Sequence, residues 1–171
     1  MSFMLIIEKA KKEDARAIHD ISRELNISYA KDKDKGVLLR IIPEEYIEQN
    51  IDNFIAARLH GSMAGFLWFN TQYPEELLGD TILQGNIDNC IYSEQIAVKR
   101  EYEGLGLGRK LYEFIKVNNP DKGILVLVNT APEGNKASFS FHTSIGFKTV
   151  GIFHKKYFCG FEDFTSKLLR L

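Results

Sequence analysis

The chain contains the stretch Gln95-Ile-Ala-Val-Lys-Arg-Glu-Tyr-Glu-Gly-Leu-Gly-Leu-Gly-Arg-Lys-Leu111. An apolar segment that ends at Val98 predicts a strand, and residues 109–117 have the apolar spacing of a helix. Three glycines lie between them, and glycines let successive backbone N–H groups approach an anion. The N-terminus of the helix adds roughly half an elementary positive charge. The stretch therefore predicts a phosphate cradle, although a turn that needs glycines only for its tight geometry would look the same.

Two commoner phosphate-binding turns do not fit the spacing. A dinucleotide-binding GxGxxG turn that began at Gly104 or Gly106 would place its third glycine at Arg109 or Leu111. A P-loop requires a Gly-Lys pair, and the sequence contains none. Neither a Rossmann dinucleotide site nor a P-loop nucleotide site is therefore predicted.

The composition is that of an ordinary globular domain. The 171 residues are 44% hydrophobic and 26% charged, which excludes a disordered tail protein and a coiled coil. The net charge is −1, from 22 Lys and Arg against 23 Asp and Glu. Because a bulk basic field is absent, no nucleic-acid partner is expected. We expect one domain over residues 1–171.

The two cysteines and the apolar runs indicate the compartment. Cys90 and Cys159 form no CxxC pair, so they predict two free thiols in a reducing compartment and neither a disulfide framework nor a metal site. The longest apolar run, residues 63–69, is far shorter than the roughly 20 residues of a membrane-spanning helix. The N-terminus lacks the basic lead of a signal peptide. We expect a cytoplasmic protein with no membrane partner.

Strand and helix patterns alternate along the chain. Strands are expected at residues 3–8, 53–59, 63–70, 90–98, 124–128, 147–157 and 161–171, and helices at 13–25, 43–50, 109–117 and 135–144. A long loop is expected around Pro74, Gly79 and Gly85, as a candidate for substrate contact. Residues 31–35 alternate in charge and predict a solvated loop. This order indicates a mixed α/β sheet.

Two motifs together resemble a known family. The turn Glu103-Gly-Leu-Gly-Leu-Gly108 resembles motif A of the GNAT superfamily of N-acetyltransferases, Arg/Gln-x-x-Gly-x-Gly/Ala after a strand that ends in Val. The stretch Asn135-Lys-Ala-Ser-Phe-Ser-Phe-His-Thr-Ser-Ile-Gly-Phe147 is similar to motif B, Asn-x-x-Ala-x-x-Phe-Tyr-x-x-x-Gly-Phe. The order of the elements before motif A is also similar, so the resemblance covers essentially the whole chain.

The resemblance implies a fold and a co-substrate. The implied fold is α/β, with a mixed, mostly antiparallel central sheet, a splayed parallel strand pair and flanking helices. The implied co-substrate is acetyl-CoA, with no metal. Its pantetheine arm would pair with the backbone of one strand segment, and its pyrophosphate would bind the N–H groups of the turn. The cofactor-binding residues implied in this way are Ile96, Ala97, Val98, Glu103, Gly104, Leu105, Gly106, Leu107, Gly108, Arg109 and Asn135.

The sequence departs from the family at residues that bear on binding and mechanism. Glu103 stands where Arg or Gln is usual, so its carboxylate must point away from the pyrophosphate or weaken binding. His142 stands where the family commonly has the tyrosine that protonates the departing thiolate. Either His142 is the general acid, or it fills the space of the tyrosine while water supplies the proton. Arg109 and Lys110 either add positive charge at the phosphates or form a solvated first helical turn.

Glu94 is the candidate general base. It shares a strand face with Ile96 and Val98, and members of the family often place a glutamate on this strand to take the proton of the amine. An amine of pKa near 10 is mostly protonated at neutral pH, so attack on a thioester needs such a base. The alternative is a strand glutamate that pairs with a neighbouring basic residue.

Two functions follow from this resemblance. The first is an N-acetyltransferase that moves the acetyl group of acetyl-CoA to a primary amine by direct attack, without an acyl-enzyme. The second is a non-catalytic acyl-CoA binding or sensing module, which the departures at Glu103 and His142 keep open. The expected acceptor is a small-molecule amine or a peptide amine. A homodimer is a further expectation, because dimers are common among proteins that resemble this one.

Overall fold

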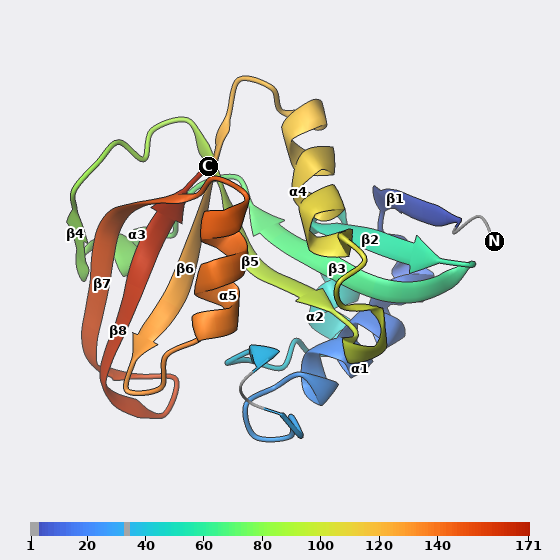
Figure 1. Cartoon of the computed structure of the whole chain (residues 1–171), viewed down its shortest axis with the longest axis horizontal. Helices are drawn as coiled ribbons and strands as arrows, with labels where there is room; N and C mark the ends of the chain where they lie inside the picture. Colours follow the sequence, from blue (N-terminus) through green and yellow to red (C-terminus); the bar gives the residue numbers. More distant parts are fainter. Residues whose placement is uncertain (1–3, 33–34) are drawn as a thin grey trace. The chain divides into compact units, whose positions relative to one another are not determined.

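The computed structural model describes residues 4–32 and 35–171. Their strands follow the order β1-β2-β3-β5-β6-β8-β7-β4 in one mixed sheet, mostly antiparallel (Figure 1). The chain divides into two compact units. The described residues of unit 1 are 4–31, 38–69 and 95–120, and those of unit 2 are 32, 35–37, 70–94 and 121–171. The prediction of a single domain stays a prediction.

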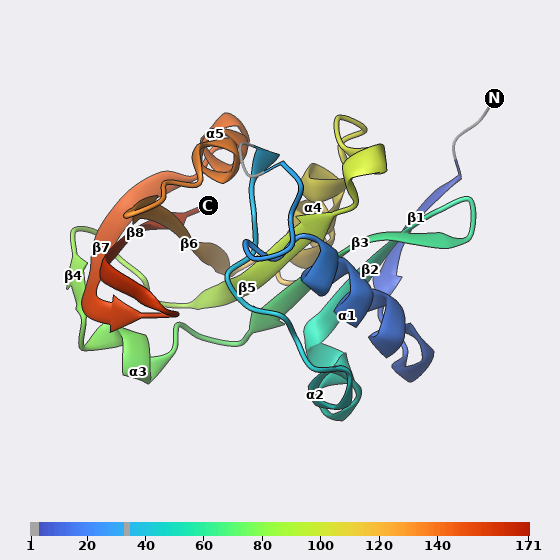
Figure 2. The same ribbon diagram turned by 90° about the horizontal axis from the view of Figure 1, so that it is seen from below.

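Unit 1 holds three antiparallel strands: β1 (Leu5–Lys9), β2 (Phe54–Leu59) and β3 (Ser62–Asn70, whose last residue belongs to unit 2). The helices α1 (Ala15–Glu24) and α2 (Glu44–Gln49) cover one face of these strands, and α4 (Leu107–Asn118) covers the other (Figure 2). The core on the side of α1 and α2 consists of buried aliphatic and aromatic side chains, among them Ile18, Ile21, Ile47, Phe54, Phe66 and Trp68.

A partly buried ion pair ties the start of unit 1 together. The guanidinium of Arg58 on β2 donates to Glu8 and to both carboxylate oxygens of Asp14, each at 2.7 Å. These two carboxylates raise the pKa of Arg58, chiefly through the hydrogen bonds to Asp14 and then to Glu8. Asp14 in turn accepts from the backbone N–H of Lys11 at 2.8 Å and so caps the 3-10 turn Lys12–Asp14 that leads into α1.

Unit 2 is built on β6 (Gly123–Ala131), β7 (Lys148–Phe158) and β8 (Phe161–Arg170), with β8 antiparallel to both of the others. The helix α5 (Lys136–Ser144) lies along β6 (Figure 1). Apolar side chains of this unit, including Tyr73, Tyr92, Leu125 and Leu168, form its core.

The strand β5 (Cys90–Val98) contributes to both units. Its first part pairs in parallel with β6, from Cys90–Gly123 to Ser93–Val126, and this is the parallel pair that the resemblance implied. The ladder covers four residue pairs, so the segment from Glu94 to Val98 continues β5 beyond its last pair. On its other side β5 neighbours β3, where the backbone N–H of Lys99 donates to the carbonyl of Ala64 at 2.8 Å.

The prediction of one long loop around Pro74, Gly79 and Gly85 is wrong. The helix α3 (Glu75–Leu78) begins directly after Pro74, and the strand β4 (Thr81–Leu83) pairs with β7. Three residues are too few to show a strand period, and two of them, Ile82 and Leu83, are exposed, at 70% and 43%. Three-residue 3-10 turns also precede α1, β2 and α4, at Lys12–Asp14, Ile51–Asn53 and Arg100–Tyr102.

The other predicted elements are confirmed within one or two residues at each end, except that β6 ends three residues later than the predicted strand and begins one residue earlier. Phe3, the predicted start of the first strand, and residues 33–34 of the charged loop lie outside the described residues. Within the part of the chain that the structure describes, no helix is both long enough and apolar enough to cross a membrane.

Candidate functional site

The glycine turn that follows β5 is left-handed at two positions. Gly104 and Gly106 both have φ +79°, a conformation that side chains with a Cβ rarely adopt. Gly106 is the N-cap of α4, and no described side chain caps this helix end. The first bond into the helix runs from the N–H of Lys110 to the carbonyl of Gly106 at 3.1 Å. The N–H groups of residues 107–109 therefore have no acceptor within the helix.

Open space surrounds this turn in unit 1. A Cβ placed on Gly104 or on Gly106 would meet no heavy atom of the described residues within 4 Å. Residues 103–106 are all exposed, whereas Leu107 is 2% exposed and anchors the helix in the core. A row of backbone donors at the positive end of a twelve-residue helix is an arrangement that suits an anion such as a pyrophosphate.

The carboxylate of Glu103 is held by an arginine. Nη1 of Arg100 lies 2.6 Å from Oε1 of Glu103, in an ion pair between residues three apart. This contact gives the carboxylate of Glu103 a positively charged partner. A paired carboxylate repels a bound pyrophosphate less than an unpaired one would. Arg100 was not among the site residues predicted from the sequence. Its position three residues before Glu103 is nevertheless a spacing that is typical of an ion pair within a helical turn.

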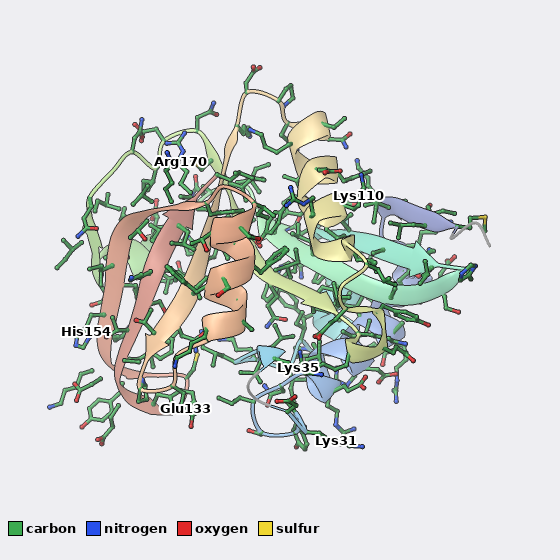
Figure 3. The ribbon with its side chains drawn as sticks, viewed as in Figure 1. Lys31, Lys35, Lys110, Glu133, His154 and Arg170 are labelled. Carbon is green, nitrogen blue, oxygen red and sulfur yellow. The ribbon has the colours of Figure 1, made fainter. Side chains whose placement is uncertain are left out.

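The basic residues at the start of α4 are exposed. Nζ of Lys110 lies 2.8 Å from Oε2 of Glu113 one turn later, and Figure 3 shows Lys110 on the outside of the helix. Arg109 is exposed as well. The sequence left two alternatives for Lys110, a phosphate contact or an exposed position in the first helical turn. Its exposure and its ion pair with Glu113 favour the second.

The strand segment before the turn packs tightly against β3. Ala97 is 5% exposed and belongs to the core, whereas Ile96 and Val98 are half-buried. A Cβ on Gly65 of β3 would lie 2.5 Å from the carbonyl oxygen of Ala97, so only glycine permits this approach. One side of the segment is thus fixed by β3.

Glu94 lies in unit 2 and has a polar partner there. Nδ2 of Asn70, at the end of β3, donates to Oε1 of Glu94 at 2.6 Å. The nearby ring of Tyr73 has a raised pKa, mainly because it is buried and to a smaller extent because of the negative charge of Glu94. Its hydroxyl donates to Oγ1 of Thr81, whose own proton goes to the carbonyl of Leu77.

Asn135 uses both ends of its side-chain amide within unit 2. Its oxygen accepts from the backbone N–H of Ser138 at 3.1 Å and so caps α5. Its Nδ2 donates to the carbonyl of Val37 at 3.2 Å. Asn135 therefore joins the start of α5 to the backbone at Val37.

His142 is buried in the same unit and is 1% exposed. Its Nδ1 lies 2.7 Å from the backbone carbonyl of Ser138, which can only accept, so Nδ1 carries the proton. The rings of Phe141 and Phe147 meet the imidazole edge-on at 4.9 and 5.0 Å. Burial lowers the pKa of His142 from 6.5 to about 4, so the ring is neutral at pH 7.

The predicted site residues thus fall into two groups. Unit 1 contains Ile96, Ala97, Val98, Glu103 and the rest of the turn through Arg109, and unit 2 contains Glu94, Asn135 and His142. Asn70 is a polar partner that was not predicted, because nothing in a single sequence links residues 24 positions apart. Among the described residues, no three His, Cys, Asp or Glu side chains are grouped so that they could hold a metal ion.

Comparisons with known proteins place this geometry in context. Residues 8–147 match the family described as acetyltransferase (GNAT). None of the curated proteins that were compared with the chain matches it.

Three solved structures illustrate the similarity of the fold. An N-acetyltransferase from Staphylococcus aureus Mu50 is 18% identical, with a TM-score of 0.66 and 98% of each chain covered. The ribosomal-protein-S18-alanine N-acetyltransferase from Escherichia coli is 17% identical, with a TM-score of 0.68, 98% of this chain and 93% of that chain covered. The protein yncA from Salmonella typhimurium, solved with its cofactor acetyl-CoA, is 16% identical, with a TM-score of 0.70 and the same coverage.

The buried imidazole predicts a specific dependence of stability on pH. In the unfolded chain His142 takes up a proton near its ordinary pKa of 6.5, but in the fold only near 4. Unfolding between these values therefore takes up a proton, and the free energy of unfolding falls by about 3 kcal/mol as the pH drops from 7 to 4. Urea titrations of the wild type and of His142→Phe should differ by this amount in their pH dependence. The exposed His154→Gln should keep the wild-type dependence, and a His142→Phe variant that also kept it would contradict the burial argument.

Proposed function

Because the chain belongs to the acetyltransferase (GNAT) family, we propose that it transfers the acetyl group of acetyl-CoA to a primary amine. The observation that carries this proposal is the open, left-handed glycine turn at the uncapped start of α4. The proposal assigns the activity to one domain formed by the whole chain, residues 1–171.

The turn supplies the anion site. The backbone N–H groups from Gly104 to Arg109 bind the pyrophosphate of acetyl-CoA, helped by the positive end of the helix dipole. The ion pair between Arg100 and Glu103 supports this role, because a paired carboxylate repels an anion less than a free one. Arg109 is exposed beside the same N–H groups and adds positive charge.

The strand segment supplies the site for the pantetheine arm. Residues Ile96 to Val98 extend β5 past the last pair of its ladder with β6, and we assign their backbone groups to hydrogen bonds with pantetheine. The two contacts of the Asn135 amide do not exhaust its hydrogen-bonding capacity. It caps α5 and donates to the carbonyl of Val37, and its remaining N–H and oxygen lone pair leave it able to contact the pantetheine arm, as we propose.

The chemistry is a direct transfer with no acyl-enzyme. The nitrogen of the amine attacks the thioester carbonyl carbon, a C–N bond forms, and the C–S bond then breaks. Glu94 accepts the proton that the amine loses, and Asn70 holds the carboxylate in place. The sulfur leaves as a thiolate. Because His142 is buried and neutral, its geometry favours the space-filling alternative, in which solvent supplies the proton to the thiolate.

The acceptor and the cellular setting are also part of the proposal. We assign a small-molecule or peptide amine as acceptor. One protein of similar structure, from Escherichia coli, is named as an N-acetyltransferase of an alanine of ribosomal protein S18. Cys90 and Cys159 form no disulfide with each other, which fits the reducing conditions of the cytoplasm, where we place the protein. A homodimer remains a proposal.

The anion site is tested by Gly106→Glu. The new carboxylate should cover the backbone donors and repel the pyrophosphate, so we expect the Kd for acetyl-CoA to rise at least about tenfold in calorimetry. Gly61→Glu is a matched control, because Gly61 has φ +83° and equally open space in the turn between β2 and β3. Equal affinity in both variants and the wild type would rule out the cradle.

The base is tested by Glu94→Gln, which keeps the size of the side chain. We expect turnover to fall by roughly two to four orders of magnitude at neutral pH, measured as thiol release over a panel of amines. The loss should shrink as the pH rises and the free amine becomes abundant. The exposed Glu76→Gln in α3 serves as control.

A uniform loss at all pH values would instead indicate a packing role for Glu94. Saturable CoA binding with no thiol release from the wild type, over the whole amine panel, would favour the non-catalytic acyl-CoA module.

A further inference from the structure

An acidic side chain stands directly before the glycine turn of unit 1. Glu103 is exposed and precedes Gly104, the first of the two left-handed positions in this turn. The N–H groups at the start of α4 follow four residues later in the chain. A carboxylate at the entry of an anion site repels the anion, because like charges brought together cost binding free energy. An anion site at this turn therefore requires that the charge of Glu103 be offset.

Arg100 holds Glu103 at two points. Nη1 of its guanidinium lies 2.6 Å from Oε1 of the Glu103 carboxylate, and its backbone carbonyl accepts the N–H of Glu103 at 3.3 Å. The 3-10 turn Arg100–Tyr102 accounts for both contacts, because side chains three residues apart in such a turn lie on the same side. The backbone and the carboxylate of Glu103 are therefore both tied to the turn that precedes them.

The 3-10 turn that carries Arg100 is itself fixed to the sheet. The N–H of Lys99 donates to the carbonyl of Ala64 on β3 at 2.8 Å, and the carbonyl of Lys99 accepts the N–H of Tyr102 at 2.9 Å. The side chain of Arg100 is 25% exposed and that of Glu103 is 36% exposed. The guanidinium thus extends from a hydrogen-bonded backbone, and the ion pair is oriented before any ligand binds.

The exposure of this ion pair separates its effect on folding from its effect on binding. An ion pair whose partners are both partly exposed contributes little to the stability of a fold. Loss of Arg100 would nevertheless leave the Glu103 carboxylate without its cationic partner, and would make the charge at the entry of the turn more negative by one unit. The pair should therefore affect the affinity for an anion much more than it affects folding.

We propose that Arg100 is a positioning residue of the pyrophosphate site, and that the site needs it because Glu103 stands at its entry. The guanidinium holds the carboxylate and cancels its charge, so the backbone N–H groups of residues 104–109 present an electropositive surface to the phosphates of acetyl-CoA. The two residues act as one unit, and loss of the arginine weakens binding only while the glutamate is present. This inference rests on the proposed function, because it takes the pyrophosphate to bind at this turn.

A double-mutant cycle tests this coupling, with the Kd for acetyl-CoA measured by calorimetry at low salt. Arg100→Gln should raise the Kd about tenfold, whereas Glu103→Gln should leave it equal or lower it. The variant that carries both substitutions should return to within about twofold of the wild type. Arg100→Lys, which keeps the charge, should bind nearly as well as the wild type. A double variant as weak as Arg100→Gln would overturn the proposal and indicate that Arg100 contacts the phosphates itself.

Salt dependence separates charge repulsion from a distorted turn. The Debye length falls from about 30 Å at 0.01 M salt to about 3 Å at 1 M, so the loss of affinity in Arg100→Gln relative to the wild type should shrink over this range. A loss that stays the same at high salt would overturn the proposal. Arg16→Gln is the charge-matched control. It removes a cation that pairs with Asp20 and Glu44 on the surface, and it should keep the affinity of the wild type.

Binding by the wild type is the reference for all of these variants. If the wild type does not bind acetyl-CoA, the proposed function and this inference are both contradicted. Saturable binding that Arg100→Gln leaves unchanged would contradict this inference alone.

Discussion

The left-handed backbone at Gly104 and Gly106 is the constraint on which the rest of the site depends. Two residues with φ +79° turn the chain from the end of β5 into the first turn of α4 without a side chain over the junction. Because no described side chain caps α4, its N–H groups keep their hydrogen-bonding capacity for another partner. Leu107, buried directly after the turn, fixes where the helix begins. Local backbone geometry thus creates an electropositive, donor-rich surface in a chain whose net charge is −1.

Burial assigns different chemical properties to the two candidate catalytic residues of unit 2. Glu94 is half-buried and accepts a hydrogen bond from Asn70. His142 is enclosed by two phenylalanine rings, and its Nδ1 proton is directed to a backbone carbonyl. A group that is neutral and already donates its proton within the fold is a poor source of protons for a leaving thiolate. In the proposed mechanism, acid-base chemistry is therefore assigned to Glu94 and to solvent.

Sequence patterns predicted the elements that are long and periodic, and they were less successful with contacts. The strand β6 and the helix α1 follow directly from apolar spacing, and Gly106 from the need for a turn. The strand β4 was missed, because it has three residues and one of them, Ile82, is largely exposed. The contact between Asn70 and Glu94 depends on tertiary structure alone. By contrast, the pair Arg100–Glu103 lies three residues apart and could have been predicted.

The most direct test of the anion site is a titration of ¹⁵N-labelled protein with acetyl-CoA, in which the backbone amide resonances of residues 104–109 are followed. Hydrogen bonds from these N–H groups to a pyrophosphate change their shielding strongly. We predict that these resonances shift more than those of the matched left-handed turn at Gly61. Saturable binding of acetyl-CoA that leaves residues 104–109 unshifted would contradict the assignment of the pyrophosphate to this turn.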